Sequence, residues 1–152
     1  MVSLLIWGCA SHPMPTVESG SPASSSKKVL LVTQNSKFKR AVASEIYAAL
    51  KSHPLYIKMI DVKNLVNQPT ADFSVVVIIN KYMAGRPDPR VEGFVDREFQ
   101  NNKIVVLTTG FKDSWKPDHP GVDAISSASV LEKSDQIARS IVDSVLVLLN
   151  SR

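Results

Sequence analysis

One polar segment of the chain has the residue types of an anion-binding turn. Residues 33–40 run from an apolar stretch into a helical pattern, and they carry three cations within four positions. Helix N-termini present unpaired N–H groups and a partial positive charge, so they attract anions and disfavour cations. An anionic ligand would offset that repulsion, although long basic side chains can also turn into solvent. The candidate ligand-binding residues here are Thr33, Asn35, Ser36, Lys37, Phe38 and Lys39.

Two later segments add polar and aromatic groups, and both follow apolar stretches. The first, residues 80–86, offers Asn80, Tyr82 and Met83, while the second spans residues 108–115. Aromatic rings in such loops can flank a planar ligand, and they equally often cover the apolar ends of strands. The second segment contributes the further candidates Thr108, Thr109, Gly110, Phe111 and Trp115.

Other kinds of chemistry find little support. The three histidines, His12, His53 and His119, are far apart in sequence, and Cys9 is the single cysteine. We therefore predict no metal site, and the catalytic residues of any enzyme activity stay unassigned, because no spacing typical of metal ligands or of a catalytic triad occurs. The net charge of +4 is spread over several segments, so nucleic-acid binding is not expected.

The elements that must position these residues alternate between strands and helices. Nearly continuous β-branched and aliphatic runs at 29–32, 74–79 and 104–107 are typical of strands buried on both faces. Residues 55–62 alternate in polarity and predict an edge strand, and residues 122–125 predict a fifth strand.

Helical spacing of apolar residues separates these strands. It predicts a helix over about 37–51, a second one after Pro89 that includes Phe99, and a C-terminal helix. Ser129 and Glu132 form a capping-box pattern, so the last helix should begin near Val130. The segment that connects two strands between residues 61 and 72 is short and should contain only one or two turns of helix.

This pattern predicts an α/β fold with a doubly wound, five-stranded parallel sheet in the order 2-1-3-4-5 and helices on both faces. The competing Rossmann order would call for a glycine-rich G-x-G-x-x-G turn after the first strand, which the sequence lacks. In such sheets ligands bind at the carboxyl ends of the strands, where the three candidate segments would meet.

The N-terminus differs from the rest. Residues 1–10 are an apolar run that is too short to span a bilayer. Ile6, Gly8 and Cys9 resemble a bacterial lipobox, which implies a signal peptide, lipidation of Cys9 and a membrane-anchored protein of the cell envelope, outside the cytoplasm. Residues 10–28 are rich in proline and serine and read as a tether. We therefore expect a leader and flexible tether at 1–27 and one domain at 28–152.

Residues 29–149 resemble flavodoxin-like domains. In flavodoxins a T-x-T-G-x-T loop holds the phosphate of FMN, and aromatic residues flank the flavin ring; here Thr33 matches the first position, while Asn35, Ser36 and Phe38 depart from the motif. Residues 36–39, 107–110 and 122–129 look like an uncharacterised lipoprotein-type subgroup.

The resemblance implies a module that binds FMN or another phosphate-bearing ligand, with a role in electron transfer. The alternatives are a flavin-free domain that binds a protein partner in the cell envelope, or an enzyme acting on an anionic substrate near Lys37 and Lys39.

Overall fold

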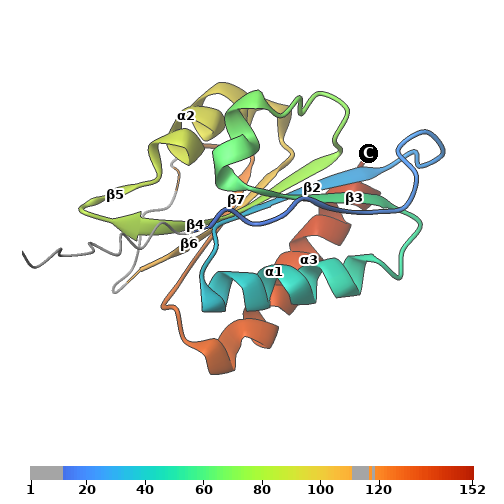
Figure 1. Cartoon of the computed structure of the whole chain (residues 1–152). Coiled ribbons are helices and arrows are strands. Elements are labelled where there is room, and N and C mark those ends of the chain that lie inside the picture. The colour runs from blue at the N-terminus through green and yellow to red at the C-terminus, as the bar shows by residue number, and fades with distance from the viewer. Residues whose placement is uncertain (1–11, 111–116, 118) are drawn as a thin grey trace, which may run out of the picture.

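The structure of the protein is a computed structural model, which describes residues 12–110, 117 and 119–152. A central sheet lies between two layers, with α1 and α3 on one face and α2 with the short helix η1 on the other (Figure 1). The elements are β1 Val17–Ser19, β2 Lys28–Thr33, α1 Lys37–Leu50, β3 Tyr56–Asp61, η1 Val62–Asn67, β4 Val75–Met83, β5 Arg86–Pro87, α2 Pro89–Glu98, η2 Phe99–Asn101, β6 Ile104–Thr109, β7 Val122–Ser127, η3 Leu131–Lys133 and α3 Ser134–Asn150.

The order of the strands gives the class of the fold. In the described residues the sheet has seven strands in the order β1-β3-β2-β4-β6-β7, with β5 paired to β4. Strands β3, β2, β4, β6 and β7 are mutually parallel and follow the predicted order 2-1-3-4-5. The sheet differs from the five-stranded prediction by two short antiparallel strands, β1 beside β3 and β5 beside β4. The domain therefore has a flavodoxin-like, doubly wound α/β fold.

The hydrophobic core has two halves, one on each face of the sheet. Successive residues of a strand point to opposite faces, so Val29 and Leu31 of β2 pack in the α1/α3 half while Leu30 and Val32 pack in the α2/η1 half. All four side chains are fully buried. Each buried aliphatic side chain contributes about 1.5–3 kcal/mol, which explains why the central strands are apolar at every position.

The first two long helices begin where the sequence places them. Ser36 caps α1 by accepting the backbone N–H of Lys39, and Asp88 caps α2 by accepting that of Arg90. Proline at the first position of α2 fits the helix start, because its missing N–H is not needed there. The prediction that Phe99 belongs to α2 was wrong, since α2 ends at Glu98 and Phe99 opens η2.

The start of the C-terminal helix also differs from the prediction. A single 3-10 turn, η3, intervenes, so α3 begins at Ser134 and not near Val130. Val130 stands at the cap of η3 without a side-chain hydrogen bond, and Ser129 does not cap a helix. Instead, the Ser134 hydroxyl donates to Glu45 Oε1 at 3.0 Å and joins α3 to α1.

Part of the segment expected to be a tether is ordered against the domain. Residues Val17–Ser19 form β1, which pairs antiparallel with β3, so β3 is not the edge strand that its alternation predicted. Gly20 follows with φ +82°, and a Cβ there would lie 2.4 Å from the Leu55 carbonyl oxygen. Only glycine allows this close approach. Strand β1 has three residues and is held by backbone pairing, so it shows no hydrophobic periodicity. The sequence analysis therefore did not predict this strand.

Strand β4 is longer than predicted. It continues through residues 80–83, which were expected to form a loop, and turns back through Ala84 and Gly85 into β5. Both turn residues have positive φ, +54° and +79°, the conformation of a two-residue hairpin turn. The hairpin carries its strands beyond the edge where β2 and β3 end (Figure 1).

Candidate functional site

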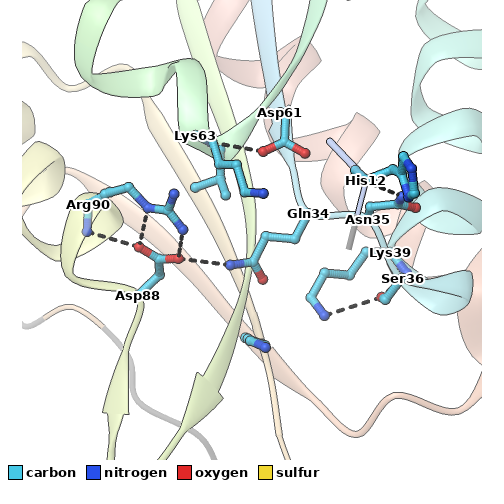
Figure 2. A pocket seen from close by; sticks show the side chains of 11 residues that line it. His12, Gln34, Asn35, Ser36, Lys39, Asp61, Lys63, Asp88 and Arg90 are labelled. Carbon is cyan, nitrogen blue, oxygen red and sulfur yellow. Dashed lines mark hydrogen bonds and ion pairs between the residues drawn. The ribbon is translucent and has the colours of Figure 1, made fainter. Parts of the chain in front are cut away.

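A pocket lies where β2, β3 and β4 end and where α1, η1 and α2 begin (Figure 2). Its volume is about 190 Å³, which is below the 300–1,000 Å³ typical of sites for drug-sized ligands. A small molecule or a single phosphate group is the appropriate size. The pocket is lined by His12, Gln34, Asn35, Ser36, Lys39, Asp61, Val62, Lys63, Lys81, Asp88 and Arg90.

The N-terminus of α1 forms one wall. Ser36 accepts the Lys39 N–H at 3.3 Å, and the first turn of the helix contains no acidic residue. The first N–H groups of a helix have no partner within the helix, so the turn has donors and a positive dipole end. The first turn holds Lys37 and Lys39, although cations oppose that dipole.

Lys39 is the most unusual side chain of this wall. It is only 5% exposed, and its Nζ donates to Ser36 Oγ at a long 3.3 Å. Burial, and secondly the charge of Lys81, lower the pKa of Lys39 to about 8. Among the described residues no carboxylate lies within 4.0 Å of its Nζ. Lys39 is thus a buried cation for which the described residues supply no anion.

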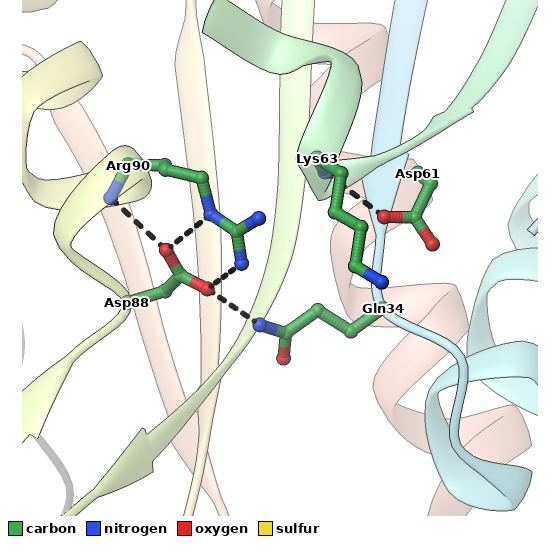
Figure 3. Close-up of polar contacts among 5 residues, drawn as sticks. All are labelled: Gln34, Asp61, Lys63, Asp88 and Arg90. Carbon is green, nitrogen blue, oxygen red and sulfur yellow. Dashed lines mark hydrogen bonds and ion pairs between the residues drawn. The ribbon is translucent and has the colours of Figure 1, made fainter. Parts of the chain in front are cut away.

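The opposite wall is a closed network at the start of α2 (Figure 3). Arg90 donates from Nε to Asp88 Oδ1 at 2.9 Å and from Nη2 to Oδ2 at 2.7 Å, while Gln34 Nε2 donates to Oδ2 at 2.9 Å. These hydrogen bonds, above all that from Arg90, hold the pKa of Asp88 below its usual value, against the opposing effect of burial. The negative charge of the Asp88 carboxylate is therefore already compensated by Arg90.

The side-chain amide of Gln34 has a hydrogen-bond acceptor without a partner among the described residues. Its Oε1 is buried and has no hydrogen-bond partner among the described residues, and Figure 2 shows the amide between Asp88 and Lys39. A buried acceptor without a donor costs about 1–3 kcal/mol. A ligand with a hydroxyl group would satisfy it.

The N-terminal segment closes a third side. Asp61, which is 2% exposed, accepts the backbone N–H of Met14 at 2.8 Å and that of Lys63 at 2.9 Å. Asn35 Nδ2 donates to the His12 carbonyl oxygen at 2.6 Å. Residues 12–14 therefore form a strap along the pocket, and Asp61 is occupied in holding it.

Only part of the predicted site comes together here. Of the predicted ligand-binding residues, Asn35, Ser36 and Lys39 line the pocket. Lys37 is exposed, and Phe38 is buried in the core half below α1. Thr33 is fully buried at the end of β2, where its hydroxyl donates to the Gln34 carbonyl oxygen at 3.4 Å.

The polar residues at the ends of β4 and β6 join these strands to each other. Asn80 Nδ2 donates to Thr108 Oγ1 at 3.0 Å, and the Thr109 hydroxyl donates to the Asn80 carbonyl oxygen at 3.2 Å. The N–H of Gly110 donates to the Ser127 carbonyl oxygen at 3.2 Å. Asn80, Thr108 and Thr109 are buried and act within the sheet, outside the pocket lining.

The predicted aromatic flank is not assembled by the described residues. Tyr82 lies on the β4–β5 hairpin, where its hydroxyl donates to the Gly85 carbonyl oxygen at 2.7 Å, and Met83 beside it is 60% exposed. Phe111 and Trp115, like Cys9, lie outside the described residues.

Several pocket residues escaped the sequence analysis, notably His12, Asp61, Lys63, Lys81, Asp88 and Arg90. One signal was available, because an aspartate followed by proline at the start of a helical pattern is typical of an N-cap. The Asp88–Pro89 pair has this form. Asp61, directly after a predicted strand, is a second acidic residue whose position at the carboxyl edge could have been noticed.

The resemblance of this chain to known proteins is distant. No protein-family profile and no curated protein sequence matches the chain significantly. Among solved structures, the chain is similar to a flavodoxin from the domain Archaea, with 14% identity, a TM-score of 0.49, and coverage of 78% of this chain and 98% of that one. The oxidised flavodoxin 2 from Bacillus cereus shows 12% identity, a TM-score of 0.43, and coverage of 77% and 99%.

The Francisella novicida lysine decarboxylase LdcF is also similar, with 18% identity and a TM-score of 0.43 over 79% of this chain and 18% of that one. The flavodoxin-like assignment rests on the order and direction of the strands.

Two general searches of the described residues complete the description of the site. No group of three or more His, Cys, Asp or Glu side chains in the described part of the chain is arranged to hold a metal ion. Within the same residues, no helix is both long and apolar enough to cross a membrane.

Proposed function

We propose that this flavodoxin-like domain binds a small phosphate-bearing or other anionic ligand in the pocket at the N-terminus of α1. The observation that carries the proposal is Lys39, a cation that is 5% exposed, lines the pocket and has no carboxylate within 4.0 Å among the described residues. Burying an unpaired charge is costly, and a bound anion would supply the missing partner.

The surroundings support an anion over a cation. Four basic side chains line the pocket, Lys39, Lys63, Lys81 and Arg90, against the carboxylates of Asp61 and Asp88. Both carboxylates already accept hydrogen bonds from the protein. The helix N-terminus adds N–H donors and a favourable dipole.

FMN is a candidate ligand because flavodoxins bind it through its phosphate. The pocket fits that phosphate in size and in its donors, and Ser36, Lys39 and the first turn of α1 would hold it. The cofactor would supply one-electron transfer chemistry. Thr33, which matches the phosphate loop of flavodoxins, points its hydroxyl to the backbone, so the contacts to FMN would differ from theirs.

Titration of purified protein tests the proposal. Inorganic phosphate and FMN are added separately, with binding followed by calorimetry and by quenching of flavin fluorescence. Lys39→Met should weaken phosphate binding about tenfold or more, since hydrogen bonds to charged groups contribute about 1.5–3 kcal/mol. Lys37→Ala, which removes an exposed lysine of the same turn, is the matched control and should change the affinity less than about threefold.

The outcomes of these titrations distinguish binding of an anion from binding of FMN. Binding of phosphate but not of FMN would leave the anion site and remove the flavin. No saturable binding of either ligand, or equal effects of the two substitutions, would contradict the site itself.

The alternative, a flavin-free domain that binds a protein partner of the cell envelope, has one supporting feature. Met83 is 60% exposed on the β4–β5 hairpin, and exposed methionines are frequent at binding surfaces. A Met83→Ser variant that still binds phosphate normally would allow partner binding at the hairpin to be tested separately from ligand binding in the pocket.

A further inference from the structure

The amine of Lys39 has the environment of a nucleophile. Its side chain runs along the pocket wall with Nζ near Ser36 Oγ (Figure 2), and that hydrogen bond of 3.3 Å uses one of its three protons. The adjacent positive charge of Lys81 and burial both disfavour the ammonium form. Desolvation and a neighbouring cation are the two conditions that activate lysines for attack on carbonyl groups.

The rest of the pocket suits a small carbonyl compound that carries a negative charge. The volume of about 190 Å³ admits a molecule of a few carbon atoms. The helix N-terminus can hold its anionic group, while the orphaned Gln34 Oε1 can accept a hydrogen bond from a hydroxyl formed on the carbonyl carbon. These features lie on the same pocket as the amine.

We propose that Lys39 forms a Schiff base with a small anionic aldehyde or 2-oxo acid bound in this pocket. The lone pair of the neutral Nζ attacks the carbonyl carbon, and one amine proton moves to the carbonyl oxygen to give a hydroxyl group. That hydroxyl then leaves as water with the second amine proton as the C=N bond forms. No electrons are gained or lost, and no further reactant is needed. The inference rests on the proposed anion site, because the anionic group must bind beside the amine.

The pKa of about 8 for Lys39 makes a pH dependence part of the proposal. At pH 8 about half of this amine is neutral, whereas an ordinary lysine with a pKa of 10.5 is almost fully protonated. The charged and titratable groups that line the pocket around it are His12, Asp61, Lys63, Lys81, Asp88 and Arg90.

Reductive trapping tests the inference on the full chain. The protein is incubated with glyoxylate and cyanoborohydride at several pH values, and modified lysines are identified by peptide mass spectrometry. Lys39 should be modified about tenfold or more faster than Lys37, with saturation as glyoxylate increases and with a rate that rises around pH 8. Acetaldehyde, which lacks the anionic group, should label Lys39 more slowly and without saturation.

Variants separate a site from general reactivity. Lys39→Arg keeps the positive charge and should abolish the saturable component, while Lys37→Arg should leave it unchanged. Modification spread evenly over exposed lysines, or equal labelling of Lys39 by glyoxylate and acetaldehyde, would overturn the proposal.

The test also distinguishes this inference from the proposed function. Phosphate that binds to the wild type, together with the absence of Lys39 trapping, would overturn the Schiff base and leave the anion site intact. Selective, saturable trapping that phosphate suppresses would support both.

Discussion

Two buried lysines lie at opposite edges of the same sheet, and their surroundings differ. Lys39 and Lys103 are each 5% exposed, and burial is the main cause that lowers the pKa of both. Lys103, just before β6, donates from Nζ to the Thr70 carbonyl oxygen at 2.7 Å; Glu98 and Asp72 act to raise its pKa, while the charge of Arg152 acts to lower it. Lys39 Nζ has a long hydrogen bond to Ser36 and feels the repulsion of Lys81, and the described residues give it no carboxylate partner.

The comparison separates two roles of a buried cation. At the amino edge the lysine completes the hydrogen bonding of the protein, so its burial is explained by the fold alone. At the carboxyl edge of the sheet the described residues give the buried charge no such compensation, and the proposed anion would supply it. Exposure and pKa alone would not have distinguished the two positions.

The largest expected difference is in stability. Lys103→Met should lower the free energy of unfolding by about 1–3 kcal/mol, because a hydrogen bond from a charged donor is lost, although the Thr70 carbonyl keeps the backbone N–H of Phe73. Lys39→Met should change it by less than about 0.5 kcal/mol or raise it, since an uncompensated charge is removed. Urea denaturation of both variants measures the contrast. Equal losses would show that Lys39 is a structural residue as well.

A smaller effect is expected in the pH dependence of stability. The folded pKa of Lys39, about 8, lies below the value of 10.5 in the unfolded chain. Between these values the unfolded state binds more protons, so stability rises with pH, by about 1 kcal/mol if pocket water screens the charge. Urea midpoints from pH 7 to pH 10 should show this rise, and Lys39→Met should flatten it. Saturating phosphate should flatten it too, because an anion favours the ammonium form. An unchanged slope in the variant would contradict the assignment to Lys39.

The smallest expected effect concerns the neighbour of Lys39. Lys81→Gln removes the second cause of the lowered pKa, so the pKa of Lys39 should rise while stability changes by less than about 0.5 kcal/mol. An NMR titration of the lysine side chains measures this shift. No shift in Lys39 would mean that burial alone sets its pKa.

The sequence was sufficient for the sheet because its central strands are buried on both faces and therefore apolar throughout. The runs at 29–32 and 104–107 lie within β2 and β6, and the run at 74–79 lies in β4 from Val75 onward; the parallel order followed from the alternation with helices. The edge of the sheet was harder, since β1 depends on backbone hydrogen bonds and on the closeness that Gly20 allows.

The site was predictable in its location but not in its composition. Lys37, Lys39 and Arg40 are alike in sequence, yet only Lys39 is buried, because the rotation of the helix turns Phe38 and Lys39 toward the sheet. Asp61 and Asp88 reach the pocket from strand and helix ends that are distant in sequence. Which side chains meet there depends on the register of the sheet.

The strap that joins Asn35 and Asp61 to residues 12–14 also controls the charge that the pocket presents. Asp61 accepts the backbone N–H of Met14, and Asn35 donates to the His12 carbonyl oxygen. A ligand that displaced the strap would take one hydrogen-bond donor from the Asp61 carboxylate, which is 2% exposed and lines the pocket. That carboxylate would then repel an anion, so the proposed anion site depends on the strap staying in place.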